Sequence, residues 1–133
     1  MRMLIVEDEF TSRSILGRIL SMYGDVDIAV DGEEALDALS KARANSVAYD
    51  VVFLDVMMPG LSGHDVLAKI REHEKKEGVT NDEQLKVVMT TAAGGKEHVL
   101  SAFRARVEAY LTKPLNRTKV EGALAKLGFE PVE

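Results

Sequence analysis

Three short apolar runs that each end in charged residues constrain this chain more than any other feature. The runs and the residues that follow them are Met3–Val6 with Glu7-Asp8, Val51–Leu54 with Asp55, and Ala109–Thr112 with Lys113-Pro114. A buried parallel strand is typically a continuous hydrophobic run, and open α/β sheets bind ligands at the carboxyl ends of their strands. The sequence therefore predicts three carboxylates and one ammonium group at a single sheet edge, where a hard divalent metal and a phosphoryl group could bind.

Helix and strand patterns alternate along the rest of the chain. Strands are expected at residues 2–6, 26–30, 51–54, 85–89 and 107–111. The first expected helix covers residues 11–23, and Asp31 caps a second that runs to about residue 44. A third carries Val66, Leu67 and Ile70 and ends near 77–78, and a fourth runs through Val99, Leu100 and Phe103. Asn116 caps the last helix and Gly128 closes it. Five βα units without a repeat or linker predict one doubly wound α/β domain, (βα)5, over residues 1–133, with a parallel sheet of order 2-1-3-4-5. The charged segment Glu72–Gln84 is expected to be a solvated helix end followed by a loop.

Composition excludes several classes of protein. The net charge is −5 and no basic cluster is long enough for a nucleic-acid patch, so direct nucleic-acid binding is not expected. The chain has no cysteine and three histidines without ligand spacing, which argues against disulfides, thiol chemistry and a zinc site. No signal peptide and no apolar run of membrane-spanning length is present, so we expect a cytoplasmic protein with no membrane contact.

The acidic residues form the best candidate site. In the expected strand order the first and third strands are neighbours, which brings Glu7 and Asp8 beside Asp55. Their mutual repulsion costs stability unless a cation binds, and Mg²⁺ prefers oxygen ligands and adds a phosphate oxygen readily. The alternative interpretation, that Glu7 and Asp8 only complement the dipole of the first helix, stays open for that pair.

Two further strand ends supply groups that suit a phosphoryl ligand. The fourth strand ends near Thr91, whose hydroxyl could donate a hydrogen bond to a phosphoryl oxygen. Lys113 ends the fifth strand, where its ammonium group could pair with Asp55 at rest and neutralise phosphoryl oxygens during transfer. The alternatives are a strand-forming threonine and a solvated lysine in a turn.

Together these motifs resemble the receiver domain of bacterial two-component response regulators, the CheY-like family with a flavodoxin-like fold. The matching segments are Leu4–Glu9, Leu54–Pro59, Met89–Ala92 and Tyr110–Pro114. The resemblance implies that Asp55 is the phosphoacceptor and that Glu7, Asp8, Asp55 and the main-chain carbonyl of Met57 bind Mg²⁺. It also implies that Thr91 and Lys113 bind the phosphoryl group and that Thr91 and Tyr110 are a switch pair. Finally, it implies that the Lys113-Pro114 bond is cis. The domain would then be a signalling switch that catalyses only its own phosphorylation and dephosphorylation, and not an enzyme acting on other substrates.

The resemblance also implies partners. A sensor histidine kinase or a phosphotransfer protein would donate the phosphoryl group. A downstream protein target would bind the face formed by the helix through Val99, the strand at 107–111 and the last helix, a face that holds Lys96, Arg104 and Arg106. No output domain follows, so we expect a stand-alone chemotaxis-type or relay regulator; the alternative is the excised receiver of a larger regulator.

Two positions depart from the family pattern. Leu61-Ser62-Gly63 stands where many receivers have Met-Asp-Gly, and Val107-Glu108 stands where Gly-Ala is usual. Both are interpreted as changes of loop and surface geometry that leave the acidic site intact. Two other classes fit less well: a flavodoxin-like FMN binder would have its phosphate repelled by Glu7-Asp8-Glu9, and a haloacid-dehalogenase-type phosphatase needs an aspartate where Met57 stands. A receiver that has lost its site and acts only as a binding module is not favoured, because every site residue is present.

Overall fold

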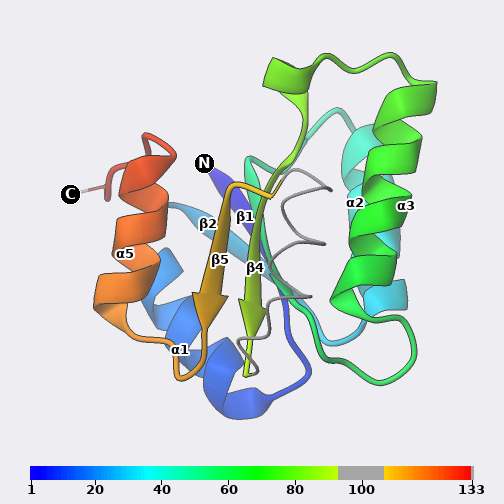
Figure 1. The fold of residues 1–133 in the computed structure, drawn as a ribbon. Coiled ribbons are helices and arrows are strands. Elements are labelled where there is room, and N and C mark those ends of the chain that lie inside the picture. Colours follow the sequence, from blue (N-terminus) through cyan, green and yellow to red (C-terminus); the bar gives the residue numbers. More distant parts are fainter. Residues whose placement is uncertain (93–106, 133) are drawn as a thin grey trace.

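A five-stranded parallel sheet forms the centre of the molecule (Figure 1). The computed structural model describes residues 1–92 and 107–132. The strands are β1 (Arg2–Val6), β2 (Asp25–Ala29), β3 (Val51–Asp55), β4 (Lys86–Thr91) and β5 (Ala109–Thr112). Their order is β2-β1-β3-β4-β5 and every neighbouring pair is parallel, which confirms the predicted topology.

Helices cover both faces of this sheet. The described helices are α1 (Phe10–Leu20), α2 (Gly32–Ala44), α3 (Gly63–Lys76), a short 3-10 helix η1 (Asn81–Glu83) and α5 (Arg117–Lys126). Figure 1 shows α1 and α5 on one face and α2 and α3 on the other. The helix expected through Val99, Leu100 and Phe103 lies outside the described residues. None of the helices in the described part of the chain has the length and apolar content needed to span a bilayer.

The central strand β3 shows why its sequence is continuously apolar. All five of its residues are buried. Val52 and Leu54 pack into the core under α2 and α3, whereas Val51 and Phe53 pack into the core under α1 and α5. Successive side chains of a strand point to opposite faces, and both faces are covered here, so no position can be polar until the strand ends. β3 therefore presents Asp55 from a rigid, fully packed backbone.

Most helix and strand boundaries predicted from local sequence signals lie within a few residues of those in the structure. The predicted caps are confirmed: the Asp31 side chain accepts a hydrogen bond from the Glu34 amide, and that of Asn116 accepts one from Lys119. In the loop that departs from the family pattern, Ser62 forms a capping box with Asp65 at the start of α3. The expected strand at 107–111 begins two residues later, because pairing with β4 starts at Ala109.

The expectation of a solvated helix end within Glu72–Gln84 is wrong at Glu74. This residue is only 7% exposed; its carboxylate accepts hydrogen bonds from the Leu85 amide at 2.6 Å and from Arg71 Nη1 at 2.8 Å. The physical reason is helical periodicity: position 74 follows Ile70 by four residues on the apolar stripe of α3 and therefore faces inward.

Glu108, at one of the departures from the family pattern, has a structural role that the sequence did not indicate. Its carboxylate accepts a hydrogen bond from the Val87 amide at 2.6 Å and lies 3.9 Å from Arg71 Nη2. The change is not confined to the surface, because Glu108 joins β5 to the start of β4 and to α3. This contact lies at the amino ends of the strands, away from the acidic residues.

Candidate functional site

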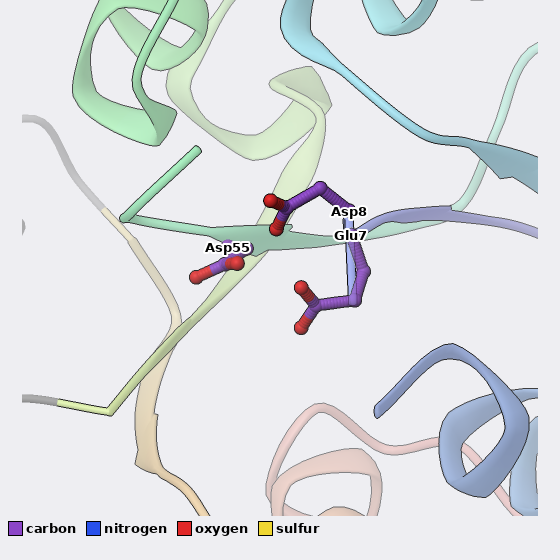
Figure 2. A group of neighbouring side chains, drawn as sticks. All are labelled: Glu7, Asp8 and Asp55. Carbon is purple, nitrogen blue, oxygen red and sulfur yellow. The ribbon is translucent and has the colours of Figure 1, made fainter. Parts of the chain in front are cut away.

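Three carboxylates meet where β1 and β3 end. The two strands are hydrogen-bonded neighbours with Val6 opposite Leu54, so Glu7 and Asp8 emerge beside Asp55. Each residue offers an oxygen, and these oxygens all lie within 4.8 Å of one another. Figure 2 shows the three side chains directed toward a common space. Glu7 and Asp55 are buried and Asp8 is exposed, so the group is open to solvent on one side.

Lys113 brings a positive charge into this group from the end of β5. Its Nζ lies 2.6 Å from Glu7 Oε1 and 3.3 Å from Asp55 Oδ2. The predicted pairing with Asp55 is confirmed; the closer approach to Glu7 is a finding that the sequence did not indicate. The Lys113-Pro114 peptide bond is cis, as the resemblance implied.

The titration behaviour of the site follows from burial and crowding. Burial and the nearby Asp55 carboxyl raise the pKa of Glu7, although Lys113 and the Glu9 amide act in the opposite direction. Burial lowers the pKa of Lys113, but its contacts with Glu7 and Asp55 outweigh burial and raise that pKa overall. Lys113 therefore contacts two of the three acids, and one ammonium group stands beside three carboxyl groups.

The donor set fits Mg²⁺. Every candidate ligand atom on the three side chains is a carboxylate oxygen, which is the donor that this ion prefers, and the exposed side leaves room for water and for a phosphate oxygen. The Met57 amide donates a hydrogen bond of 3.1 Å to Asp55 Oδ1, so the loop after β3 is tied to the carboxylate. A metal contact from the Met57 carbonyl remains a prediction.

Thr91 and Tyr110 lie on the two strands beside this site. Asp55 pairs with Thr90 across β3 and β4, so the next residue, Thr91, stands at the same edge, where it is fully buried. The Lys113 amide donates to the Thr91 carbonyl at 2.7 Å. Burial raises the pKa of Tyr110, and an interaction with the Thr91 side chain partly opposes this. Tyr110 pairs with Met89, two residues before Thr91 on β4, so the two residues of the predicted switch pair lie on adjacent strands.

Sequence patterns missed two residues that shape the site. Arg13 of α1 donates from Nη1 to the carbonyl oxygens of Asp8, at 2.9 Å, and of Glu7, at 3.3 Å. Gly63 packs so tightly on the end of β3 that a Cβ atom there would overlap the Asp55 carbonyl group. Neither contact has a local sequence signal, since each joins segments from different elements.

Comparison with known proteins identifies the family of this chain. The family model described as the response regulator receiver domain matches residues 3–125. The chain belongs to this family. Membership of this family replaces the FMN-binding and phosphatase alternatives.

Curated relatives of this receiver domain include chemotaxis proteins and hybrid histidine kinases. It is 34% identical to chemotaxis protein CheY of Treponema pallidum over 128 residues, which cover 95% of this chain and 81% of that protein. It is 33% identical to hybrid signal transduction histidine kinase L of Dictyostelium discoideum, covering 96% of this chain but only 7% of the kinase. The chain thus spans a small part of the hybrid kinases that it matches.

Solved structures support the same fold. Chemotaxis protein CheY4 of Vibrio cholerae has a TM-score of 0.78 at 25% identity, covering 94% of this receiver domain and 96% of that chain. A putative response regulator from Chloroflexus aurantiacus has a TM-score of 0.77 at 29% identity, covering 96% and 97%.

Proposed function

We propose that this receiver domain accepts a phosphoryl group on Asp55, in the presence of Mg²⁺, from the phosphohistidine of a sensor histidine kinase or phosphotransfer protein. The observation that supports this most is the setting of Asp55: a carboxylate only 2% exposed, with an ammonium group at 3.3 Å and two further acids beside it. A carboxylate in this setting is rigidly oriented and needs a cation, and its acidic neighbours can supply the ligands for one.

Transfer would proceed by displacement at phosphorus. A carboxylate oxygen of Asp55 forms the new P–O bond while the P–N bond of the donor breaks and the imidazole leaves with its electron pair. Bound Mg²⁺ supplies charge neutralisation between the acids and the phosphoryl oxygens. Lys113 and the Thr91 hydroxyl bind the remaining phosphoryl oxygens as charge builds up on them. Hydrolysis of the acyl phosphate returns Asp55, so the domain acts as a switch on itself.

The donor protein would meet apolar surface around the acids. Phe10 and Met57 follow the acidic residues closely in sequence and are 72% and 60% exposed. We propose that these two exposed side chains contribute to the contact with the donor protein.

The output would be a change in a protein-binding surface. Phosphorylation adds charge and acceptor oxygens beside Thr91. Movement of the Thr91 hydroxyl toward them would let Tyr110 rotate inward and alter the face that includes β5 and α5. Lys96, Arg104 and Arg106, which were expected on that face, lie outside the described residues. We propose a protein target here and no direct contact with nucleic acid, whether the domain acts alone or within a larger regulator.

Mass spectrometry after incubation with Mg²⁺ and acetyl phosphate tests the phosphoacceptor. The wild type should gain one phosphoryl group, Asp55→Asn should gain none, and the wild type without Mg²⁺ should gain none. Asp37→Asn, at an exposed aspartate on α2, is the matched control and should be labelled like the wild type. Equal labelling of Asp55→Asn and the wild type would overturn the assignment.

NMR with Mg²⁺ and beryllofluoride, a non-covalent phosphoryl mimic, tests the switch. Resonances of Tyr110 and of α5 should shift together with those around Asp55. Because a ligand shifts an equilibrium only by its differential affinity, exchange broadening at Tyr110 is expected without the mimic as well. Shifts confined to the loops around Asp55 would contradict this mechanism.

A further inference from the structure

We propose that Arg13 is a positioning residue, which holds the main chain of Glu7 and Asp8 in the conformation that binds Mg²⁺. This inference rests on the proposed metal site and adds a residue that makes no contact with the ion. Glu7 and Asp8 follow the last residue of β1, whereas Asp55 is itself part of a strand, so contacts from outside β1 are needed to fix the main chain of the two acids.

The contacts of Arg13 form a clamp on that loop. One guanidinium nitrogen, Nη1, donates to the Asp8 carbonyl at 2.9 Å and to the Glu7 carbonyl at 3.3 Å. The guanidinium carbon lies 5.7 Å from the centre of the Phe10 ring, within the range of a cation–π contact. Arg13 is anchored on α1, so the peptide groups after Glu7 and Asp8 are tied to a rigid element.

A second set of bonds shows that the loop is ordered as a unit. The Glu9 amide donates to Glu7 Oε2 at 3.2 Å, and the Ser12 hydroxyl donates to Glu9 Oε1 at 2.8 Å. With the Glu7 carbonyl held by Arg13 and the Glu7 carboxylate held by the Glu9 amide, little freedom is left at this residue. Preorganised ligands bind a metal more tightly because less conformational entropy is lost on binding.

The sign of the Arg13 charge makes this proposal testable. A guanidinium group near a cation site repels Mg²⁺, so removal of its charge alone would strengthen binding, on the order of twofold in solvent-exposed surroundings. Loss of two hydrogen bonds that order the loop would instead weaken binding, by about threefold to tenfold. The two roles of Arg13 therefore predict opposite changes in the Mg²⁺ dissociation constant.

The experiment is an NMR titration of the whole chain with Mg²⁺, without a phosphodonor. Arg13→Ala should raise the dissociation constant about threefold to tenfold. Arg13→Lys, which keeps the charge but loses the planar guanidinium group that fixes the direction of the two Nη1 N–H bonds, should give an intermediate value. Arg18→Ala is the matched control, because Arg18 is an exposed arginine of the same helix; its dissociation constant should stay equal to or slightly below that of the wild type. An unchanged or lower dissociation constant in Arg13→Ala would overturn the proposal.

Amide hydrogen exchange of the metal-free protein provides a second readout. The Glu9 amide should exchange faster in Arg13→Ala than in the wild type, and at the wild-type rate in Arg18→Ala. If the wild type bound no Mg²⁺, the proposed function would fail, while exchange at Glu9 would still decide whether Arg13 orders the loop. Equal Glu9 exchange in Arg13→Ala and the wild type would contradict the clamp directly.

Discussion

Lys113 faces two buried carboxylates at once. Its Nζ contacts Glu7 at 2.6 Å and Asp55 at 3.3 Å, and its side chain is 13% exposed. At rest the lysine offsets the repulsion between the acids. During transfer the same charge is available to phosphoryl oxygens, so one residue serves the stability of the free protein and the chemistry.

Lys113→Met should destabilise the metal-free protein by about 3 kcal/mol, because it leaves two buried carboxylates without their ammonium partner. Saturating Mg²⁺ should recover much of this loss, since the ion can take over the charge. Urea unfolding with and without Mg²⁺ measures both effects. Lys126→Met, at an exposed lysine of α5, is the control and should change stability by no more than about 0.5 kcal/mol. An equal loss with and without Mg²⁺ would contradict the charge argument.

At the scale of elements, the start of α3 is packed against the end of β3. The Gly63 amide donates to the Val56 carbonyl at 2.9 Å, and a Cβ at Gly63 would overlap the Asp55 carbonyl. The first turn of α3 therefore sets the path of the chain just after the phosphoacceptor. The departure Leu61-Ser62-Gly63 keeps glycine at the position where the close approach requires it.

Gly63→Ala should displace the Asp55 backbone and slow phosphorylation by acetyl phosphate at least tenfold, with a stability loss of about 2 kcal/mol. Gly122→Ala on α5 is the matched control: among the described residues no atom beyond the adjoining backbone of α5 lies within 4 Å of its added Cβ, so it should be labelled normally and gain about 0.5 to 1 kcal/mol from higher helix propensity. Labelling rates and thermal unfolding measure both variants. Normal labelling of Gly63→Ala would show that the overlap is relieved without moving Asp55.

The other end of α3 is held by buried charge. Glu74 accepts hydrogen bonds from the Leu85 amide and from Arg71, and Arg71 in turn donates to the Leu85 carbonyl at 2.9 Å. These bonds join α3 to the residue that enters β4. Because a buried ion pair is costly to break from one side, the contribution of Glu74 should far exceed that of an exposed pair on the same helix.

Glu74→Ala should lower the free energy of unfolding by about 3 kcal/mol, since it leaves the Leu85 amide without its acceptor and removes the carboxylate that pairs with the largely buried Arg71. Glu72→Ala removes an exposed glutamate that pairs with Lys76 at 3.2 Å on the same helix, and it should cost less than about 0.5 kcal/mol. Urea unfolding of the two variants provides the comparison. Similar losses would mean that the buried pair is no stronger than the exposed one.

At the scale of the whole molecule, one end of the sheet carries the candidate site and the other carries structural contacts. The carboxyl ends of the strands hold the acids, Lys113 and Thr91. The opposite end holds structural contacts, among them Tyr49, whose hydroxyl donates to Asp27 at 2.7 Å and whose ring lies 4.6 Å from the Arg2 guanidinium carbon. Burial and the bond to Asp27 raise the pKa of Tyr49 to about 12. Burial also raises the pKa of Tyr23 and of Tyr110 above 10.0.

The stability of the fold should therefore fall as pH rises from about 10 to about 12. Over this range the native protein keeps phenolic protons that the unfolded chain loses, so it binds more protons than the unfolded state and is disfavoured by a rise in pH. Ultraviolet titration of tyrosinate should show ionisation above 10 in the native protein and near 10 in urea. Tyr49→Phe should remove the transition near 12, and native tyrosines that all ionise near 10 would contradict the assignment.

The sequence by itself determined what depends on neighbours along the chain. Strand and helix periods, the caps at Asp31 and Asn116, and polar residues placed directly after apolar strands were enough to predict a doubly wound parallel sheet. In the 2-1-3-4-5 order, which is one of the common orders of such sheets, Glu7 and Asp8 then lie beside Asp55. These features are local, or follow from the rule that parallel strands end at the same edge.

Only the tertiary structure decided which distant groups meet, and how closely. Lys113 lies nearer to Glu7 than to Asp55, Glu74 is buried, Arg13 holds two carbonyls, and Gly63 touches the backbone of β3. Each of these depends on the distance and angle between packed elements. Such distances come from how side chains fill the core, and a one-dimensional pattern of apolar and polar residues does not contain them.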